Sequence, residues 1–304
     1  MRRAIGITTA ERIVMAVVEG DQVIGSLRRY PEDETAADEL MGMPAEDIAR
    51  TIREQIVAVL EGGSIDVVGV GLPGIVRNGI IEESPNLQQL KGCRMRELLS
   101  SELRDAKIEA PILLYNDADI VAAGLAARRG QLDRHVRVWT LGHGIGFGVY
   151  PHAEGIWEGG HTVVSLDPAE KYCGCGGVGH LEGIMGHRAM RLRFLDMEPD
   201  EVFQGARKGE QRCVEFVKLW HRALAAATAS SIHMSGPGKF FLTGHHAPHV
   251  DLNLLNQYLH DMVKMSPLQG YVFEIVPGDE EIAVIGAAVN AIRATFAGEL
   301  PEEP

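Results

Sequence analysis

The chain has 304 residues, of which 45% are hydrophobic and 23% charged, as in ordinary folded proteins with full hydrophobic cores. Its 29 basic and 42 acidic side chains give a net charge of −13, which argues against a nucleic-acid partner. Met1 is followed almost at once by a strand-like segment, and no stretch reaches the roughly 18 apolar residues of a membrane span. Cys93 and Cys213 look like isolated thiols. We therefore expect a soluble cytoplasmic protein with no membrane partner.

The first third of the chain predicts a repeating order of strands and helices. Apolar runs predict strands, helical spacing of isoleucines after Pro44 predicts a helix, and Gly62 and Gly63 end it. The expected elements are two strands within 4–18, a third strand at 23–27, a helix over 48–60 and a buried strand at 66–72.

A polar pair follows the next buried strand. A helix is expected near 95–103, a strand at 112–115 and a helix over 121–128. Asn116 and Asp117 stand at the carboxyl end of this strand, where open α/β sheets place their ligand chemistry. Both residues also favour helix caps, so a capping role remains open.

The pattern then starts again, which indicates two similar α/β lobes facing a cleft, each beginning with a three-strand meander. The segment 142–148 has glycine at every second position, which suits either phosphate binding or a hairpin turn. The expected strands are 136–141, one opening at 149, 239–244 and 272–276, and the expected helices are 184–195, 211–234, 252–262 and 282–296.

A loop segment carries four metal-ligand side chains. His161, Cys173, Cys175 and His180 provide two thiolates and two imidazoles, enough to close a tetrahedral structural Zn²⁺ site. The alternative is chance proximity, but two of four cysteines lie one residue apart in a glycine-rich stretch. Such a metal would fix the loop and so position two carboxylates, Glu158 and Glu182. Three other histidines, His245, His246 and His249, form a loop cluster that could bind a stray metal ion but that we expect to face solvent.

Several motifs together resemble the ROK family of bacterial repressors and sugar kinases, within the actin-like ATPase superfamily. They are Gly69-x-Gly71-x-Pro73-Gly74, Ser84-Pro85-Asn86-Leu87, Asn116-Asp117-Ala118, Glu158-x-Gly160-His161, Cys173-x-Cys175-Gly176-x-x-Gly179-x-Leu181-Glu182 and Ile285-Gly286-Ala287-Ala288. The resemblance implies an α/β fold of two RNase H-like lobes around a central cleft, with a zinc-bound loop. The smaller lobe would comprise 1–118 plus 284–304, and the larger one 119–283.

The resemblance also implies function. Family members of this length phosphorylate hexoses or N-acetylhexosamines with ATP and Mg²⁺ and are commonly homodimers. The family's repressors carry an additional amino-terminal helix-turn-helix domain, which we do not expect here because the first strand starts so early.

Each site residue carried over from the family has a stated role. Asp117 would be the general base that accepts the proton of the attacking sugar hydroxyl. The sugar-binding residues would be Asn116, Glu158, His161 and Glu182, with Gly74 and Asn86 nearby, and the nucleotide-binding residues would be Thr9, Gly142, His143, Gly144 and Gly244. His161, Cys173 and Cys175 match three zinc ligands of the family, while the fourth, normally cysteine, is His180.

The nucleotide-binding motifs depart from the family pattern. The usual Asp-x-Gly-Gly-Thr motif is replaced by Ile7-Thr8-Thr9-Ala10-Glu11. The glycine turn at 142–148 contains His143 and Phe147. A second glycine turn of the family is replaced by Thr243-Gly244-His245-His246. Side chains thus stand where phosphate needs bare backbone. Three hypotheses follow: a sugar kinase with an unusual phosphate-donor site, a sugar-binding or regulatory protein without ATP turnover, and a zinc-stabilised structural protein.

Overall fold

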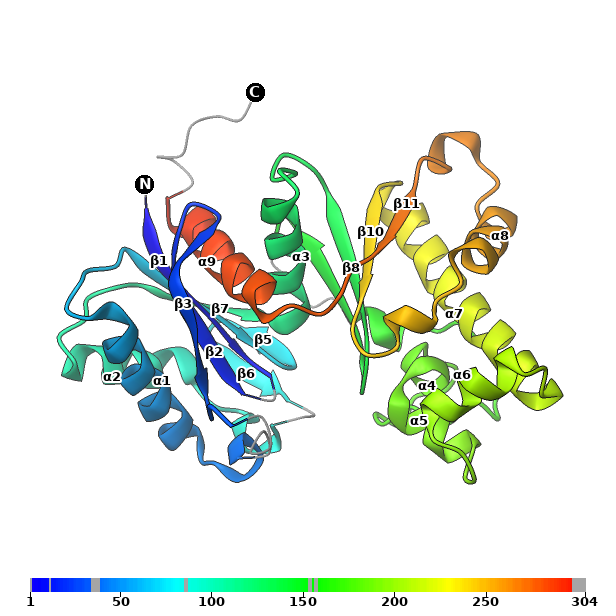
Figure 1. Cartoon of the computed structure of the whole chain (residues 1–304), viewed down its shortest axis with the longest axis horizontal. Coiled ribbons are helices and arrows are strands. Elements are labelled where there is room, and N and C mark those ends of the chain that lie inside the picture. Colours follow the sequence, from blue (N-terminus) through cyan, green and yellow to red (C-terminus); the bar gives the residue numbers. More distant parts are fainter. Residues whose placement is uncertain are drawn as a thin grey trace. The chain divides into compact units, whose positions relative to one another are not determined.

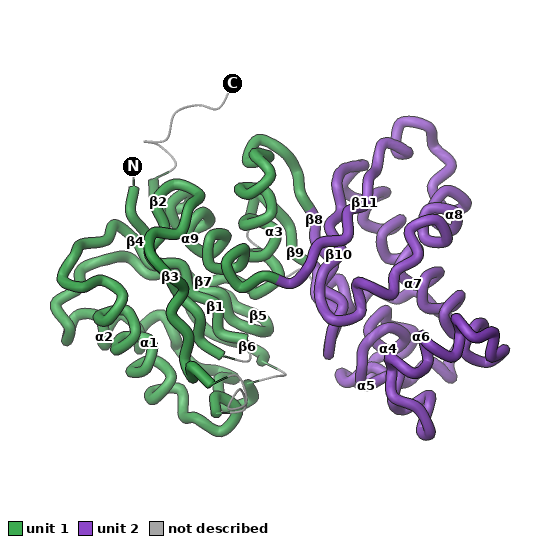
Figure 2. The backbone as a smooth tube through the Cα atoms, viewed as in Figure 1, with its two compact units in different colours: residues 1–136, 148–156, 279–304 green, residues 137–147, 157–278 purple. Residues whose placement is uncertain are grey.

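The computed structural model describes residues 2–10, 12–33, 39–84, 87–152, 155 and 158–296. The chain forms two compact units, each assembled from separate stretches of sequence (Figure 2). Unit 1 comprises 1–136, 148–156 and 279–304, and unit 2 comprises 137–147 and 157–278. Residues 119–136, 148–156 and 279–283 therefore group with unit 1, whereas the sequence-based division placed them in the larger lobe.

Unit 1 is built on a five-stranded sheet in the order β3-β2-β1-β4-β7. Its strands are β1 (Arg3–Thr9), β2 (Ile13–Glu19), β3 (Gln22–Tyr30), β4 (Val67–Leu72) and β7 (Ile112–Asn116). The first three strands form an antiparallel meander, and β4 and β7 extend the sheet in parallel to β1. Every residue of β4 is buried, as its continuous apolar run predicted.

Helices cover both faces of this sheet (Figure 1). The core on one face joins sheet residues such as Ile5 and Val68 to α1 (Ala45–Leu60) and α2 (Met95–Asp105). The core on the other face joins Ala4 and Tyr115 to α3 (Asp117–Arg128) and α9 (Glu280–Phe296). The helix α9 comes from the end of the chain and lies against β1, β4 and α3. A small hairpin of β5 (Ile75–Arg77) and β6 (Ile80–Glu83) stands apart from the sheet.

Glycines allow α3 and α9 to pack backbone against backbone. A Cβ on Gly286 would lie 1.7 Å from the carbonyl oxygen of Ile120, and one on Gly124 would lie 1.9 Å from that of Ile282. Since real Cβ atoms never approach an oxygen so closely, any side chain here would separate the helices. The close packing of α3 and α9 therefore explains why the motif Ile285-Gly286-Ala287-Ala288 has glycine at its second position.

A second, four-stranded sheet has the order β11-β10-β8-β9 and lies mostly in unit 2, since only residue 136 of β8 and residues 148–150 of β9 group with unit 1. The strands are β8 (Val136–Leu141), β9 (Ile145–Tyr150), β10 (Lys239–Thr243) and β11 (Val272–Ile275). The helices are α4 (Glu182–Met185), α5 (His187–Arg193), α6 (Pro199–Arg207), α7 (Gln211–Ser235) and α8 (Leu252–Met262). Trp139 and Trp220 are fully buried in its core, and the Trp139 indole donates to the Thr228 hydroxyl.

Unit 2 differs from the sequence-based expectation at four places. Within the described residues its meander has two strands rather than three, because Val163 forms only an isolated bridge with His180. The glycine turn is shorter than expected, since β9 already begins at Ile145. The helix expected over 184–195 is two helices, because Gly186 adopts an extended conformation with ψ of 147°. The helix α6 was not predicted at all.

Short 3-10 helices complete the described part of the chain. They are η2 (Gln88–Leu90), η3 (Gly159–His161), η4 (Ala247–His249) and η5 (Ser266–Leu268). Two of them bear on function, because η3 ends at a predicted zinc ligand and η4 ends at a histidine of the 245–249 cluster.

Candidate functional site

In unit 1 the end of β7 presents Asn116 and Asp117 side by side. Asn116 is the N-cap of α3, and its side-chain oxygen accepts the Ala118 N–H at 2.8 Å. Asp117 is the first helical residue, and its Oδ1 accepts the same N–H at 2.9 Å. The positive end of the helix dipole favours a carboxylate at this position. The capping role left open above is therefore real for Asn116.

The same asparagine amide also holds the loop at Gly74. Asn116 Nδ2 donates to the Gly74 carbonyl oxygen at 2.9 Å, so one side chain links two predicted sugar-site residues of unit 1. Gly74 has φ of +100°, and a Cβ there would lie 2.0 Å from the Glu83 carbonyl oxygen. Only glycine suits this turn.

Of two further predicted site residues in unit 1, the structure describes Thr9 but not Asn86. Thr9 is buried, and its hydroxyl donates to the carbonyl oxygen of Gly71 at 3.0 Å, which ties β1 to β4. Asn86 lies outside the described residues, as does Glu11 of the altered first phosphate motif.

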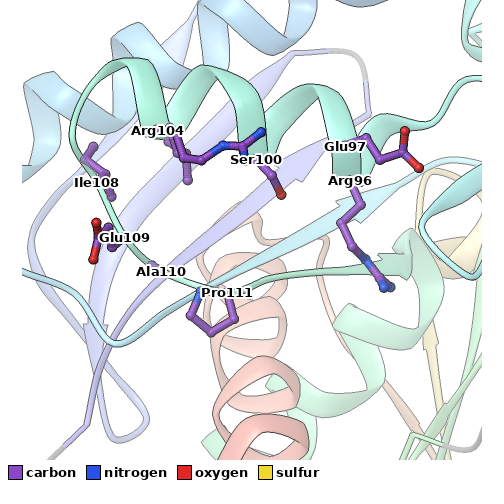
Figure 3. A pocket seen from close by; sticks show the side chains of 9 residues that line it. Arg96, Glu97, Ser100, Arg104, Ile108, Glu109, Ala110 and Pro111 are labelled. Atoms are coloured by element: carbon purple, nitrogen blue, oxygen red, sulfur yellow. The ribbon is translucent and has the colours of Figure 1, made fainter.

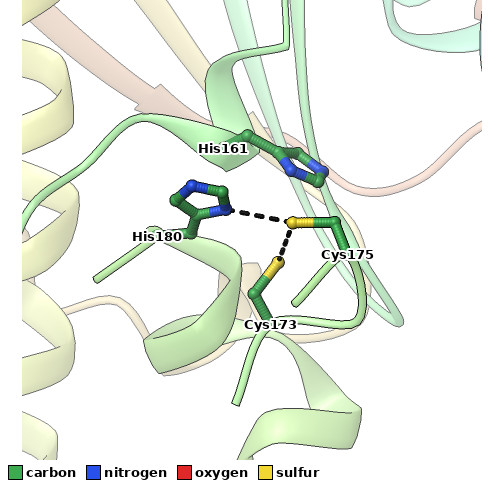
Figure 4. A group of neighbouring side chains, drawn as sticks. All are labelled: His161, Cys173, Cys175 and His180. Atoms are coloured by element: carbon green, nitrogen blue, oxygen red, sulfur yellow. Dashed lines mark hydrogen bonds between the residues drawn. The ribbon is translucent and has the colours of Figure 1, made fainter. Parts of the chain in front are cut away.

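In unit 2 the four predicted zinc ligands converge (Figure 4). One ligand atom from each of His161, Cys173, Cys175 and His180 lies within 4.8 Å of all the others. The two sulfur atoms are 3.4 Å apart, and Cys175 Sγ is 3.2 Å from His180 Nδ1. These contacts join η3 to the loop before α4.

This cluster fits a tetrahedral zinc ion. Zn–S and Zn–N bonds of usual length place two sulfurs about 3.8 Å apart, and a sulfur and a nitrogen about 3.5 Å apart. The observed separations are within a few tenths of an ångström of both values. Burial, together with the negative charge of Glu182, raises the pKa of the Cys173 thiol to about 12, so this thiol needs a cation to become a ligand. The Gly177 N–H donates to Cys175 Sγ and supports a thiolate there.

The loop that carries Cys173, Cys175 and His180 (the zinc loop) also contacts Glu182. Its Oε1 lies 3.7 Å from Cys173 Sγ, which donates to it only while that thiol is protonated, and its Oε2 accepts the Ile145 N–H at 3.0 Å. Glu182 begins α4 and is half-buried, so its carboxylate lies between the cysteine loop and the turn that precedes β9. The other predicted carboxylate, Glu158, is the residue before η3.

The predicted phosphate turn uses several of its own N–H groups internally. The Gly142 N–H donates to the Gly144 carbonyl oxygen, and the Gly146 N–H donates to the Thr140 hydroxyl, both at 3.1 Å. The Ile145 N–H is taken by Glu182, and a Cβ on Gly144 would lie 2.7 Å from that same carboxylate. These bonds resemble those of a hairpin turn more than those of an open anion nest.

The histidines after Gly244 do not all face solvent, so that expectation is wrong. His246 is fully buried, and the His249 side chain is only 16% exposed, whereas His245 is 63% exposed. The His246 N–H donates to the Leu141 carbonyl oxygen at 2.8 Å, which joins this turn to the end of β8. A tight turn with φ of +96° at Gly244 allows the approach.

A hollow beside α2 does not contain the predicted chemistry. It is lined by the helix residues Arg96, Ser100 and Arg104 and by the segment 108–111 (Figure 3). The predicted catalytic, sugar-binding and metal-binding residues do not line it, so we do not assign function to it.

Across the described residues, no helix combines the length and the apolar character needed to cross a membrane.

The comparisons agree with this architecture. The family model of the ROK family matches residues 13–293. The chain belongs to the ROK family. Related ROK sequences include a glucokinase of Thermotoga maritima, 30% identical over 285 residues (83% of this chain and 87% of the relative), and a glucokinase of Pyrobaculum calidifontis, 28% identical over 258 residues (79% and 83%).

The fold is that of ROK sugar kinases. The ROK hexokinase of Thermus thermophilus superposes with a TM-score of 0.79 at 22% identity, covering 97% of this chain and all of that one. The α/β fold expected from the motifs is thereby confirmed, whereas the roles of the individual site residues stay predictions.

Sequence reasoning missed some residues of these sites. Thr140 and Ile145 close the glycine turn, and Asp200 meets the histidine turn after Gly244. The Glu198/Glu201 capping box at the start of α6 was the available signal for the helix that carries Asp200.

Proposed function

We propose that this chain is a sugar kinase that transfers a phosphoryl group from a nucleotide to a hydroxyl of a hexose or an N-acetylhexosamine. The observation that carries the proposal is the placement of Asp117, a carboxylate at the first position of α3, directly after a parallel strand. Membership of the ROK family and sequence similarity to two glucokinases, at 28% and 30% identity, support the proposal.

The proposed chemistry needs little covalent work from the protein. Phosphoryl transfer requires an oriented nucleophile, a group that accepts its proton, and stabilisation of phosphate charge. Asp117 accepts the proton of the sugar hydroxyl, while Asn116 keeps the start of α3 and the Gly74 loop in place. When bound, ATP would supply the phosphoryl group, and Mg²⁺ would offset the negative charge of its phosphates.

In unit 2 we assign sugar recognition to Glu158, His161 and Glu182. Carboxylates accept hydrogen bonds from sugar hydroxyls, and a site of this kind rejects analogues that leave a carboxylate unpaired. A structural Zn²⁺ on His161, Cys173, Cys175 and His180 would hold the loop beside Glu182, whose Oε2 accepts the Ile145 N–H whether or not Cys173 is a thiolate.

The substitution Asp117→Asn tests the proposal. Asparagine retains an oxygen for the Ala118 N–H but cannot accept a proton at neutral pH, so we expect turnover to fall by about 10²-fold or more with sugar affinity unchanged. A coupled kinase assay and calorimetry with glucose, mannose and their N-acetylamino forms measure both quantities. Asp21→Asn, at an exposed turn, is the matched control. Unchanged turnover in Asp117→Asn would remove the catalytic role.

One observation favours a second function, a sugar-binding or regulatory protein without ATP turnover. The N–H groups of Gly142, Ile145 and Gly146 are engaged within unit 2, and Glu182 places negative charge beside Gly144. Titration with ATP and Mg²⁺ separates the two functions. Binding of a sugar with no detectable nucleotide binding and no phosphorylated product would establish the second.

A further inference from the structure

A second cluster of metal-ligating side chains lies in unit 2, apart in sequence from the zinc loop. Asp200 in the first turn of α6 meets His246 and His249 from the turn after β10, with one donor atom of each within 4.8 Å of the others. His249 Nε2 is 3.1 Å from Asp200 Oδ1, and His245 Nε2 lies 3.4 Å from the same oxygen.

The burial of the His246 side chain is not compensated by hydrogen bonds within the described residues. Its side chain is completely buried, and both Nδ1 and Nε2 lack a hydrogen-bond partner within the described part of the chain. A buried polar group left unpaired costs about 1–3 kcal/mol. Histidines that serve only as scaffold are paired, as His221 shows: its Nδ1 bonds the Val217 carbonyl oxygen and its Nε2 accepts the Asp251 N–H.

The surroundings leave His246 available to a metal ion. Neutral imidazole binds a metal through the lone pair of a ring nitrogen, and neither ring nitrogen of His246 is used in a hydrogen bond within the described residues. Its backbone N–H bonds the Leu141 carbonyl oxygen, which fixes the turn. The His249 ring stacks on Phe203 at 4.2 Å between centroids, which fixes the orientation of the second imidazole.

We propose that Asp200, His246 and His249 bind one divalent transition-metal ion, independently of the zinc loop. Two imidazoles and one carboxylate suit ions such as Zn²⁺, Co²⁺, Ni²⁺ or Fe²⁺, whereas Mg²⁺ and Ca²⁺ prefer oxygen ligands. The 3.1 Å between His249 Nε2 and Asp200 Oδ1 is close to the spacing of two donors on one such ion. Three protein ligands leave further coordination positions for water or an anionic oxygen, and exposed His245 stands beside them.

Cobalt substitution tests the proposal, since Co²⁺ reports its ligands by absorption. The metal-free wild type should bind two Co²⁺ ions, and only the zinc loop should give a thiolate-to-cobalt charge-transfer band. Asp200→Asn and His249→Gln should each bind only one Co²⁺ ion, or bind the second ion at least about tenfold more weakly than the wild type. The charge-transfer band of the remaining ion should keep its intensity. His260→Gln, at an exposed position on α8, is the control and should still bind two ions.

A reciprocal variant keeps the test decisive. Cys173→Ser with Cys175→Ser should bind one Co²⁺ without the charge-transfer band, and adding His249→Gln should abolish that binding. If the double serine variant does not fold, the stoichiometries of Asp200→Asn and His249→Gln decide alone. Two ions bound by both of these variants, or one ion bound by the wild type with the charge-transfer band, would overturn the proposal.

Discussion

Asn116 makes two contacts that set the geometry at the start of α3. Its side-chain oxygen accepts the Ala118 N–H, and its amide nitrogen donates to the Gly74 carbonyl oxygen. A single amide thus holds the helix that carries Asp117 and the turn at Gly74. The residue is only half-buried, so its importance comes from these bonds and not from packing.

We therefore expect Asn116→Ala to lower the free energy of unfolding by about 2 kcal/mol, through loss of a helix cap and one further hydrogen bond. Asn116→Ser retains a capping oxygen but cannot reach Gly74, so its loss should be about half as large. Urea unfolding monitored by circular dichroism measures both. Equal stabilities for alanine and serine would show that the cap contributes nothing.

Among the elements, α3 and α9 depend most on the absence of side chains. A Cβ on Gly124 would approach the Ile282 carbonyl oxygen to 1.9 Å, and neither helix backbone can move without disturbing the sheet core. We expect Gly124→Ala to cost about 2 kcal/mol or more, because overpacking outweighs the better helix propensity of alanine. Gly270→Ala, where a Cβ meets nothing within 4 Å, should be neutral. Thermal unfolding of both variants checks the difference.

The junction of α7 and α8 makes stability depend on pH. His221 is buried, and its Nε2 accepts the N–H of Asp251, the N-cap of α8. Burial lowers the pKa of His221 below its usual 6.5, and a hydrogen bond to Val217 opposes the shift in part. His221 therefore binds a proton more readily in the unfolded chain than in the folded chain.

It follows that this contribution to stability is complete above about pH 6.5 and is lost as the pH falls toward the folded-state pKa. Metal-free His246, whose pKa burial lowers to about 4, also loses its contribution as the pH falls below about 6.5. We expect the free energy of unfolding to fall between pH 6.5 and 4, and less steeply in His221→Gln. Identical slopes for wild type and variant would contradict the assignment.

The long elements were predictable because their apolar residues repeat over many turns, as in α7, or run without interruption, as in β4. The helix α6 was missed although Pro199 at its first position and the Glu198/Glu201 capping box both signal a helix start. His161, Cys173, Cys175 and His180 share one stretch of sequence, so their clustering could be predicted, and their role as zinc ligands stays a prediction. Burial of His246 was not predictable, because it depends on a contact between the turn after β10 and the end of β8.

For the molecule as a whole, the zinc loop is expected to stabilise unit 2. Dialysis against a strong chelator should lower the melting temperature by several degrees and make Cys175, already exposed, react faster with a thiol reagent. Added Zn²⁺ should reverse both effects. A Cys175→Ser variant should melt lower from the start and respond less to chelator. A wild type insensitive to chelator would exclude a structural metal.

The route of the chain through its two units also affects synthesis on the ribosome. Most of unit 2 is a continuous run of residues, but unit 1 needs α9, the last helix of the described chain, to cover β1, β4 and α3. The part of the sheet that α9 covers therefore stays exposed until Glu280–Phe296 has been synthesised, although α3 is made earlier on the same face. Chaperones that bind nascent chains have their longest opportunity at the residues that α9 later covers, such as Ala4 and Tyr115.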